Sequence, residues 1–258
     1  MEKEILGLFK ACTLEVEDVM DGLETTSLRK TTKMGADGTP TSELDSIVEK
    51  VAIDHLKENC EYNILSEEYG LLKGRDKGSI IMDPIDGTSN ALSGIPFYSI
   101  SLAFTPDKFS DTSVGYVKNL PLGREYHAIK GKGSYLDGER LPRLPPNKEL
   151  NFSVYMGKKA HPDSVRIADL ARRTRSLGSA SLEMCMVAEG IFDMYYIVTV
   201  NKERSLRITD IIASTLILRE AGGEVYQSRW IPIDMPLDVS ARSDVMAIRD
   251  GSVRKVIE

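Results

Sequence analysis

The sequence Gly78-Ser79-Ile80-Ile81-Met82-Asp83-Pro84-Ile85-Asp86-Gly87-Thr88-Ser89-Asn90 joins an apolar run to two acids, a proline and a glycine. The apolar run predicts a buried strand. We expect this strand to end at Asp83, because Pro84 fixes its own φ and pushes the preceding residue into an extended conformation. The turn should return Asp86 to the side of Asp83. Gly87 lets the backbone approach a ligand closely, and a short helix can begin at Thr88.

The chemistry of this segment suits a metal ion and a phosphate. It offers two carboxylates, the carbonyl of Ile85 and the hydroxyl of Thr88, and hard oxygen ligands of this kind suit Mg²⁺ or Mn²⁺. The free N–H groups and the positive dipole end of a helix that begins at Thr88 suit a phosphate. A plain turn is the alternative, because the pattern Asp-x-x-Asp before glycine is common at helix starts.

Two distant segments carry further acids. Ser66-Glu67-Glu68 ends a strand predicted over 62–65, and adjacent strands that end at the same sheet edge would place Glu67 beside Asp83 and Asp86. The alternative is a solvated acidic loop. Asp210 stands at the start of a strongly apolar helix, where the alternative is a simple N-cap, a role that need not exclude metal binding.

The remaining sequence predicts layers of helices and strands. Two amphipathic helices, over 2–23 and from about Ser42 with Thr41 or Ser42 as N-cap, should form an antiparallel pair on one face of a sheet, and the polar stretch 25–39 between them reads as a loop. Further strands are expected at 98–104, 112–117 and 125–129, with hairpin turns at 131–133 and 137–138. The later part alternates strands at 152–156, 192–198 and near 225 and 245 with helices from 162, over 179–188 and over 210–221.

A proline-rich patch suggests where two halves meet. Pro142, Pro145 and Pro146 divide the chain into an N-terminal α+β half, 1–144, with the metal-binding motif, and a C-terminal α/β half, 145–258, that completes the active site. A length of 258 residues allows one large domain or two intimate ones.

Composition excludes several classes of protein. Hydrophobic content of 41% and charged content of 28% are typical of a globular chain, and no stretch approaches the roughly 20 apolar residues of a membrane span. A net charge of −6 argues against a nucleic-acid surface. It does not argue against an anionic substrate, because bound divalent cations reverse the local sign. Three separated cysteines and the lack of a signal peptide favour a reducing, cytoplasmic location.

Several ordered motifs together resemble the inositol monophosphatase family of Mg²⁺-dependent phosphatases, which includes archaeal fructose-1,6-bisphosphatases. The first family motif is matched by residues 83–90 and the second by Thr209-Asp210-Ile211-Ile212-Ala213-Ser214 through Glu220-Ala221-Gly222-Gly223. The acidic pair Glu67-Glu68 lies upstream at the family spacing. Gly131 to Gly138 matches the family hairpin, and Gly178-Ser179-Ala180-Ser181 matches its substrate loop.

The resemblance implies a five-layered αβαβα sugar-phosphatase fold, a homodimer, and two or three Mg²⁺ ions per site, with Mn²⁺ as an alternative. By position, Glu67, Asp83 and the Ile85 carbonyl would hold the first ion, and Asp83, Asp86 and Asp210 the second. Glu67 and Thr88 would orient the attacking water. Asp45 would help a weaker third ion, or else stabilise its helix dipole as a first-turn acid. Substrate contacts would come from Asp86, Gly87, Thr88, Ser89, Gly178, Ser179, Ala180, Arg207 and Asp210.

Departures from the animal enzymes bear on the substrate. Ile197 stands where those enzymes have an acid that contacts inositol, and Thr209 replaces their usual tryptophan. The basic residues Lys202, Arg204 and Arg207, with Arg172, Arg173 and Arg175, favour a second phosphate, although a solvated basic face is the alternative. We therefore expect a small-molecule substrate, either a sugar bisphosphate or inositol phosphate, attacked directly by water.

Two other functions stay open at this stage. A 3′-phosphoadenosine 5′-phosphate nucleotidase of the same fold would need an apolar or aromatic adenine platform, which the sequence does not reveal. A non-catalytic phosphate-binding homologue is disfavoured by the complete set Glu67, Asp83, Asp86, Asp210 and Thr88.

Overall fold

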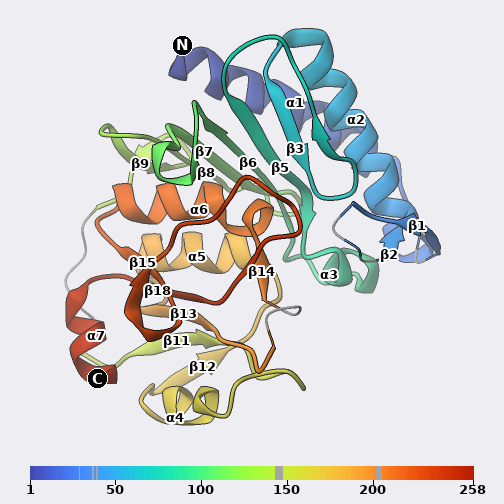
Figure 1. The fold of residues 1–258 in the computed structure, drawn as a ribbon. Helices are drawn as coiled ribbons and strands as arrows, with labels where there is room; N and C mark the ends of the chain where they lie inside the picture. Colours follow the sequence, from blue (N-terminus) through green and yellow to red (C-terminus); the bar gives the residue numbers. More distant parts are fainter. Residues whose placement is uncertain (29, 37, 39, 143–147, 202–204) are drawn as a thin grey trace.

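Helices and sheets alternate in layers along the molecule (Figure 1). The computed structural model describes residues 1–28, 30–36, 38, 40–142, 148–201 and 205–258. The order of layers is a helix pair, an eight-stranded sheet, a second helix pair, a six-stranded sheet and two short helices. The expected five-layered αβαβα architecture is confirmed.

The first layer is the predicted helix pair, α1 (Glu2–Asp21) and α2 (Glu43–Asn59). Their buried stripes pack on one face of the larger sheet, and they share one apolar cluster with the strands beneath them. Ser42 caps α2: its hydroxyl accepts the N–H of Asp45, and the Asp45 carboxylate accepts the N–H of Ser42. This reciprocal capping box fixes where α2 begins, and therefore where Asp45 stands.

The eight-stranded sheet has the order β10-β9-β8-β7-β6-β5-β3-β4. Its central strands are β3 (Asn63–Ser66), β5 (Ser79–Asp86) and β6 (Ser99–Thr105), and β3 pairs with β5 in parallel. The other pairs are antiparallel. The outer strands are β4 (Gly70–Leu72), β7 (Val114–Asn119), β8 (Glu125–Ile129), β9 (Gly133–Leu136) and β10 (Glu139–Arg140).

The prediction that β5 ends at Asp83 is wrong, because the strand continues to Asp86. The register with β6 shifts between Asp83 and Asp86, so Pro84 lies in an irregularity of the ladder. A proline is tolerated at a bulge because no ladder hydrogen bond needs its missing N–H. Gly87 follows at φ +99° and leads directly into α3 (Thr88–Ser93).

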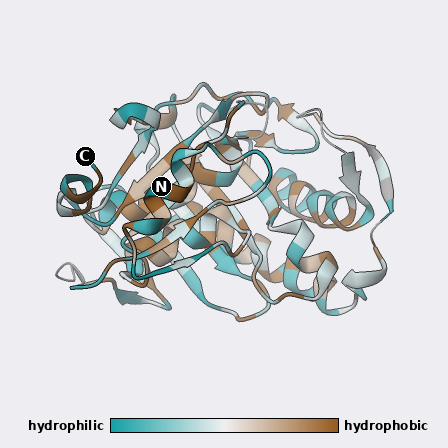
Figure 2. Cartoon of the chain, turned by 90° about the horizontal axis from the view of Figure 1, so that it is seen from below, coloured by the Kyte–Doolittle hydropathy of each residue, from teal (hydrophilic) through white to brown (hydrophobic). Residues whose placement is uncertain are grey.

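The second helix pair lies between the two sheets. It consists of α5 (Ala180–Glu189) and α6 (Ile208–Glu220), and α6 is buried from Ile208 through Leu218. Figure 2 shows apolar residues concentrated toward the middle of the molecule and polar residues mostly in the outer loops. A helix that is apolar all round needs such a central position. One apolar cluster joins Ile81 and Val117 of the first sheet to Ile212 and Ile217 of α6.

The six-stranded sheet has the order β12-β11-β13-β18-β15-β16. Its strands are β11 (Asn151–Val154), β12 (Arg173–Arg175), β13 (Met194–Ile197), β15 (Glu224–Gln227), β16 (Ile231–Pro232) and β18 (Val245–Ile248). Two short helices, α4 (Asp163–Asp169) and α7 (Gly251–Ile257), cover its outer face. A two-stranded ribbon of β14 (Leu206–Arg207) and β17 (Arg242–Ser243) precedes α6.

Some elements differ from the prediction. The stretch 25–39, expected to be a loop, contains η1 (Thr25–Ser27) and β1 (Thr31–Met34), and β1 pairs with β2 (Pro40–Ser42). Helix α7 was not predicted. The proposed boundary between residues 144 and 145, with Pro145 and Pro146, lies outside the described residues. Among the described helices, none combines the length and the apolar character that a bilayer span requires.

Candidate active site

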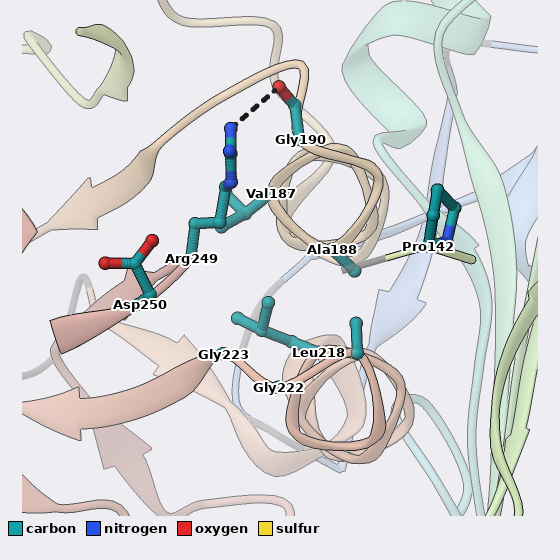
Figure 3. A pocket seen from close by; sticks show the side chains of 10 residues that line it. Pro142, Val187, Ala188, Gly190, Leu218, Gly222, Gly223, Arg249 and Asp250 are labelled. Atoms are coloured by element: carbon teal, nitrogen blue, oxygen red, sulfur yellow. Dashed lines mark hydrogen bonds between the residues drawn. The ribbon is translucent and has the colours of Figure 1, made fainter. Parts of the chain in front are cut away.

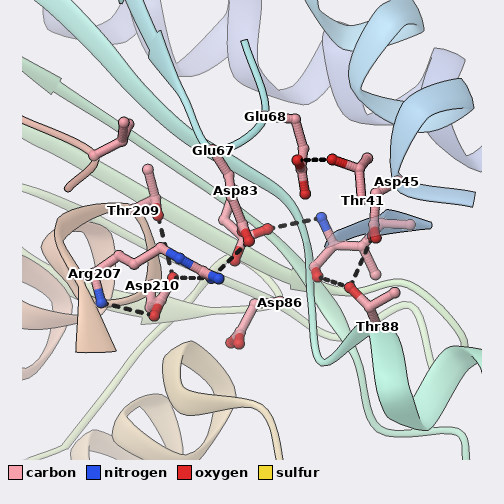
Figure 4. Close-up of polar contacts among 12 residues, drawn as sticks. Thr41, Asp45, Glu67, Glu68, Asp83, Asp86, Thr88, Arg207, Thr209 and Asp210 are labelled. Atoms are coloured by element: carbon pink, nitrogen blue, oxygen red, sulfur yellow. Dashed lines mark hydrogen bonds and ion pairs between the residues drawn. The ribbon is translucent and has the colours of Figure 1, made fainter. Parts of the chain in front are cut away.

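A cavity of about 580 Å³ opens where β3 and β5 end (Figure 4). Residues from β2, α2, the β3–β4 turn, β5, α3 and the start of α6 line it. They are Pro40, Ser42, Asp45, Glu67, Glu68, Asp83, Ile85, Asp86, Gly87, Thr88, Ser89, Leu92, Ser93, Arg207 and Asp210. Most residues predicted for the site thus meet in one place. The described residues that line it include no aromatic side chain, so they offer no aromatic platform for adenine.

Three carboxylates converge at the inner end of this cavity. The parallel pairing of Ser66 with Met82 makes Glu67 and Asp83 emerge side by side, and the first turn of α6 adds Asp210. One oxygen from each of these three acids lies within 4.8 Å of the other two. The adjacency of Glu67 and Asp83 agrees with the expectation drawn from strand order.

Burial and mutual repulsion raise the pKa of Asp83 well above its usual value. Burial is the largest cause, followed by the charges of Glu67, Asp86 and Asp210, and the nearby Arg207 acts in the opposite direction. A buried group of like charges needs a compensating cation. The donor atoms of the cluster are all carboxylate oxygens, and Ile85 lines the same cavity, so the residues present fit Mg²⁺ or Mn²⁺.

Asp86 lines the same cavity but lies outside the three-acid cluster. In Figure 4 its carboxylate points toward the start of α5. Oδ2 accepts the hydroxyls of Ser179 (2.7 Å) and Ser181 (2.5 Å) and the N–H of Ser181 (2.7 Å), while Oδ1 accepts the N–H of Ala180 at 3.2 Å. Burial and Asp210 raise the pKa of Asp86 to about 6, against the effect of these hydrogen bonds.

The contacts of Asp86 clarify the role of the predicted substrate loop. The segment Gly178, Ser179 and Ala180 does not line the cavity. Instead, Ser179 and Ala180 donate hydrogen bonds to the Asp86 carboxylate. The N-terminal end of α5 thereby acquires a carboxylate from the other half of the chain, which suits the helix dipole. Whether Asp86 is also a metal ligand stays a prediction.

Thr88 and Asp45 form a hydrogen-bonded pair at the cavity wall. The Thr88 hydroxyl lies 2.8 Å from Asp45 Oδ1 and 3.0 Å from the Ile85 carbonyl oxygen, and donates to them. The other oxygen of Asp45 accepts the N–H of Ser42 in the capping box. Both interpretations of Asp45 therefore have a structural basis, since one oxygen stabilises α2 and the other faces the site.

Two buried acids that support the site were not predicted. Glu49 is completely buried and accepts the Ser66 hydroxyl and the N–H groups of Glu68 and Tyr69, which fixes the turn that presents Glu67. Glu183 accepts the Ser153 hydroxyl and the N–H groups of Leu177 and Gly178. Its pKa is raised because burial outweighs these hydrogen bonds. An acid inside an apolar run, as in Leu182-Glu183-Met184, was the available signal.

The basic residues separate into two groups. Arg207 lies in the cavity, where its Nη1 is 2.6 Å from Glu67 Oε1 and 3.6 Å from Asp210 Oδ1. Arg173 and Arg175 are exposed on the edge strand β12, and Arg172 pairs with Glu149, so these three do not line the cavity. Lys202 and Arg204 lie outside the described residues. The expected basic cluster around a second phosphate is thus reduced to Arg207 among the described residues.

A second, smaller cavity of about 170 Å³ lies at the opposite ends of α5 and α6 (Figure 3). Gly190, Gly222, Gly223 and Arg249 are among the residues that line it. The Arg249 guanidinium lies 3.3 Å from Asp193 Oδ1 and 3.5 Å from the Gly190 carbonyl oxygen. This cavity lacks a cluster of acids among the described residues, so the acidic cavity is the candidate for chemistry.

Comparisons with known proteins agree with the resemblance found in the motifs. Residues 3–242 match the model of the inositol monophosphatase family. A fructose-1,6-bisphosphatase/inositol-1-monophosphatase of Methanothermobacter thermautotrophicus is 39% identical over 232 residues, which cover 83% of this chain and 81% of that protein. A bifunctional NADP phosphatase/NAD kinase of Methanococcus maripaludis is 34% identical over 87% of this chain, which spans only 43% of that relative's length.

A solved structure shows the same arrangement of layers. It is a hypothetical protein from Pyrococcus horikoshii described as having similarities to inositol-1 monophosphatase. It superposes with a TM-score of 0.87 at 26% identity, over 100% of this chain and 98% of that one.

Proposed function

Because the chain belongs to the inositol monophosphatase family, we propose that it is a Mg²⁺-dependent phosphomonoesterase that hydrolyses inositol monophosphate, fructose 1,6-bisphosphate or both. The observation that carries the proposal is the convergence of Glu67, Asp83 and Asp210 within 4.8 Å, in a cavity that also holds Thr88 and Asp45. A homodimer and a cytoplasmic location stay predictions from the family resemblance and the sequence.

In a metal-assisted hydrolysis, different residues of the cavity would have different roles. Glu67, Asp83, Asp210 and the Ile85 carbonyl would hold the divalent cations, with Asp86 as a further ligand. When bound, these cations supply positive charge for the phosphoryl oxygens and lower the pKa of the attacking water. The N–H groups of Gly87, Thr88 and Ser89 lie at the start of α3, where backbone donors lack intrahelical partners. They would bind the phosphoryl oxygens.

Thr88 and Asp45 provide a path for the proton of the attacking water. The Thr88 oxygen would accept this proton while its own hydroxyl proton passes to Asp45 Oδ1, 2.8 Å away. The bond from the water oxygen to phosphorus forms as the ester P–O bond breaks. The alcohol leaves with a proton from solvent, and the other product is inorganic phosphate.

A panel of phosphate esters tests this function. Phosphate release should be measured with inositol 1-phosphate, fructose 1,6-bisphosphate, 3′-phosphoadenosine 5′-phosphate and NADP, each with Mg²⁺ and with EDTA. We expect Mg²⁺-dependent turnover of one or both of the first two. Among the described residues, none that lines the cavity is aromatic, so we expect the two nucleotides to be poorer substrates. Turnover confined to NADP would replace the proposed activity with the NADP phosphatase activity named for the Methanococcus relative. No turnover of any ester would refute the proposal that the protein is a phosphomonoesterase.

A further inference from the structure

The three-acid cluster contains a cation supplied by the chain itself. The Arg207 Nη1 atom lies 2.6 Å from Glu67 Oε1 and 3.6 Å from Asp210 Oδ1, and Figure 4 shows the guanidinium among these carboxylates. The three side chains are 20%, 13% and 9% exposed, respectively. These ion pairs are thus largely shielded from solvent. Shielded ion pairs are stronger than ion pairs at a surface.

The backbone of Arg207 is pinned, so only its side chain can move. Its N–H donates to Asp210 Oδ2 at 2.9 Å, and β14 pairs Arg207 with Arg242 of β17. These contacts fix the Cα at the start of α6. The side chain has several rotatable bonds, so a displacement of the guanidinium would leave the backbone contacts of Arg207 in place.

Arg207 and a divalent cation compete for the same oxygens. Ligand oxygens of Glu67, Asp83 and Asp210 lie within 4.8 Å of one another, so a divalent cation held among them would bind the carboxylates that Arg207 contacts. A guanidinium in contact with Glu67 would stand close to that cation, and two positive charges at such a distance repel strongly in a partly buried site. The ion pair seen here therefore opposes the binding of a cation at these acids.

We propose that Arg207 is the resting counter-ion of the active site: it offsets part of the negative charge of the acid cluster in the absence of a divalent cation and is displaced when the cation binds. The proposal rests on the proposed function, because it requires the cluster to bind a cation. It gives Arg207 a double effect. The metal-free fold is stabilised by the ion pairs, and the apparent affinity for the cation is weakened because those ion pairs must first be broken.

Substitution of Arg207 tests the proposal with two measurements that do not depend on catalysis. We expect Mn²⁺, followed by electron paramagnetic resonance, to bind R207Q at least about tenfold more tightly than the wild type, because glutamine removes the competing charge. R207K keeps a charge but loses the planar fork, and should fall between the two. R219Q, which removes a guanidinium from the far end of α6, is the matched control and should bind like the wild type.

The second measurement is the melting temperature with EDTA and with saturating Mn²⁺. R207Q should melt several degrees below the wild type in EDTA, and this difference should close when Mn²⁺ is bound. A residue with a merely structural role would lower the melting temperature equally in both conditions. Equal or weaker Mn²⁺ binding by R207Q, with normal binding by the wild type, would overturn the inference and leave the proposed function intact. Absence of Mn²⁺ binding by the wild type would overturn both.

Discussion

Replacing Asp83 by asparagine is expected to lower kcat for phosphate release by at least about a thousandfold, equivalent to roughly 4 kcal/mol of transition-state stabilisation. Asp83 is the most buried acid of the cluster, and its neighbours Glu67, Asp86 and Asp210 all act on its pKa. An amide keeps the shape of the side chain but removes the negative charge that a divalent cation requires. The check is steady-state phosphate release at saturating Mg²⁺.

Stability measurements show whether D83N is folded and whether the buried negative charge of Asp83 destabilises the wild type. In EDTA, D83N should be at least as stable as the wild type at alkaline pH, because ionised Asp83 is destabilised by burial and by its acidic neighbours. The raised folded-state pKa means that the folded wild type binds this proton more tightly than the unfolded chain does. Its stability relative to D83N therefore rises as pH falls through that pKa.

A matched acid outside the cavity serves as the control for D83N. Asp244 is half-buried and accepts the N–H of Thr199 and the hydroxyl of Ser205. D244N makes the same chemical change in another hydrogen-bonded network, and kcat should stay within about tenfold of the wild type. Near-normal turnover by D83N, or an equal loss in D244N, would refute the role given to Asp83.

Gly87→Ala is expected to cause the largest loss of stability of any single methyl addition at the site, about 2–4 kcal/mol. Gly87 has φ +99°, where a side chain is strained. A Cβ would also lie 3.1 Å from the Gly178 carbonyl oxygen and 3.3 Å from the Ser179 Cβ. The added methyl would push back the segment that holds Asp86, so activity should fall together with stability. Urea denaturation and kcat are the two measurements.

Gly123→Ala separates crowding from backbone strain. Gly123 has φ +70°, and nothing lies within 4 Å of the position of an added Cβ. We expect this control to lose only about 1–2 kcal/mol from the left-handed conformation and to keep its activity. The account is contradicted if G87A and G123A lose the same stability and keep the same activity. The close packing of the two halves at Gly87 would then contribute nothing to stability or activity.

Much of the fold follows from local sequence signals. The stripe of α1, the capping of α2 by Ser42 and the apolar run before Asp83 each specify an element with little help from distant residues. The irregularity at Pro84 was not foreseen, because the constraint that proline places on its neighbour does not tell whether β6 continues to pair beyond it. The ribbon of β1 and β2 was missed because a short polar hairpin has no alternating pattern.

The sequence predicts which acids form the site but not which residues contact those acids. Parallel strand ends bring Glu67 and Asp83 together, an inference that needs only the order of β3 and β5. The direction of the Asp86 carboxylate depends on α5, which lies over 90 residues further along the chain. For the same reason, the position of Arg207 against Glu67 could not be inferred from the basic composition of its segment.

The most direct test of the central claim is a crystal structure of the protein soaked in Mn²⁺, with data that locate manganese by its anomalous scattering. We predict a strong anomalous peak bounded by carboxylate oxygens of Glu67, Asp83 and Asp210, with the Arg207 guanidinium moved away from Glu67. A fully occupied manganese elsewhere, with none at these three acids, would contradict the account.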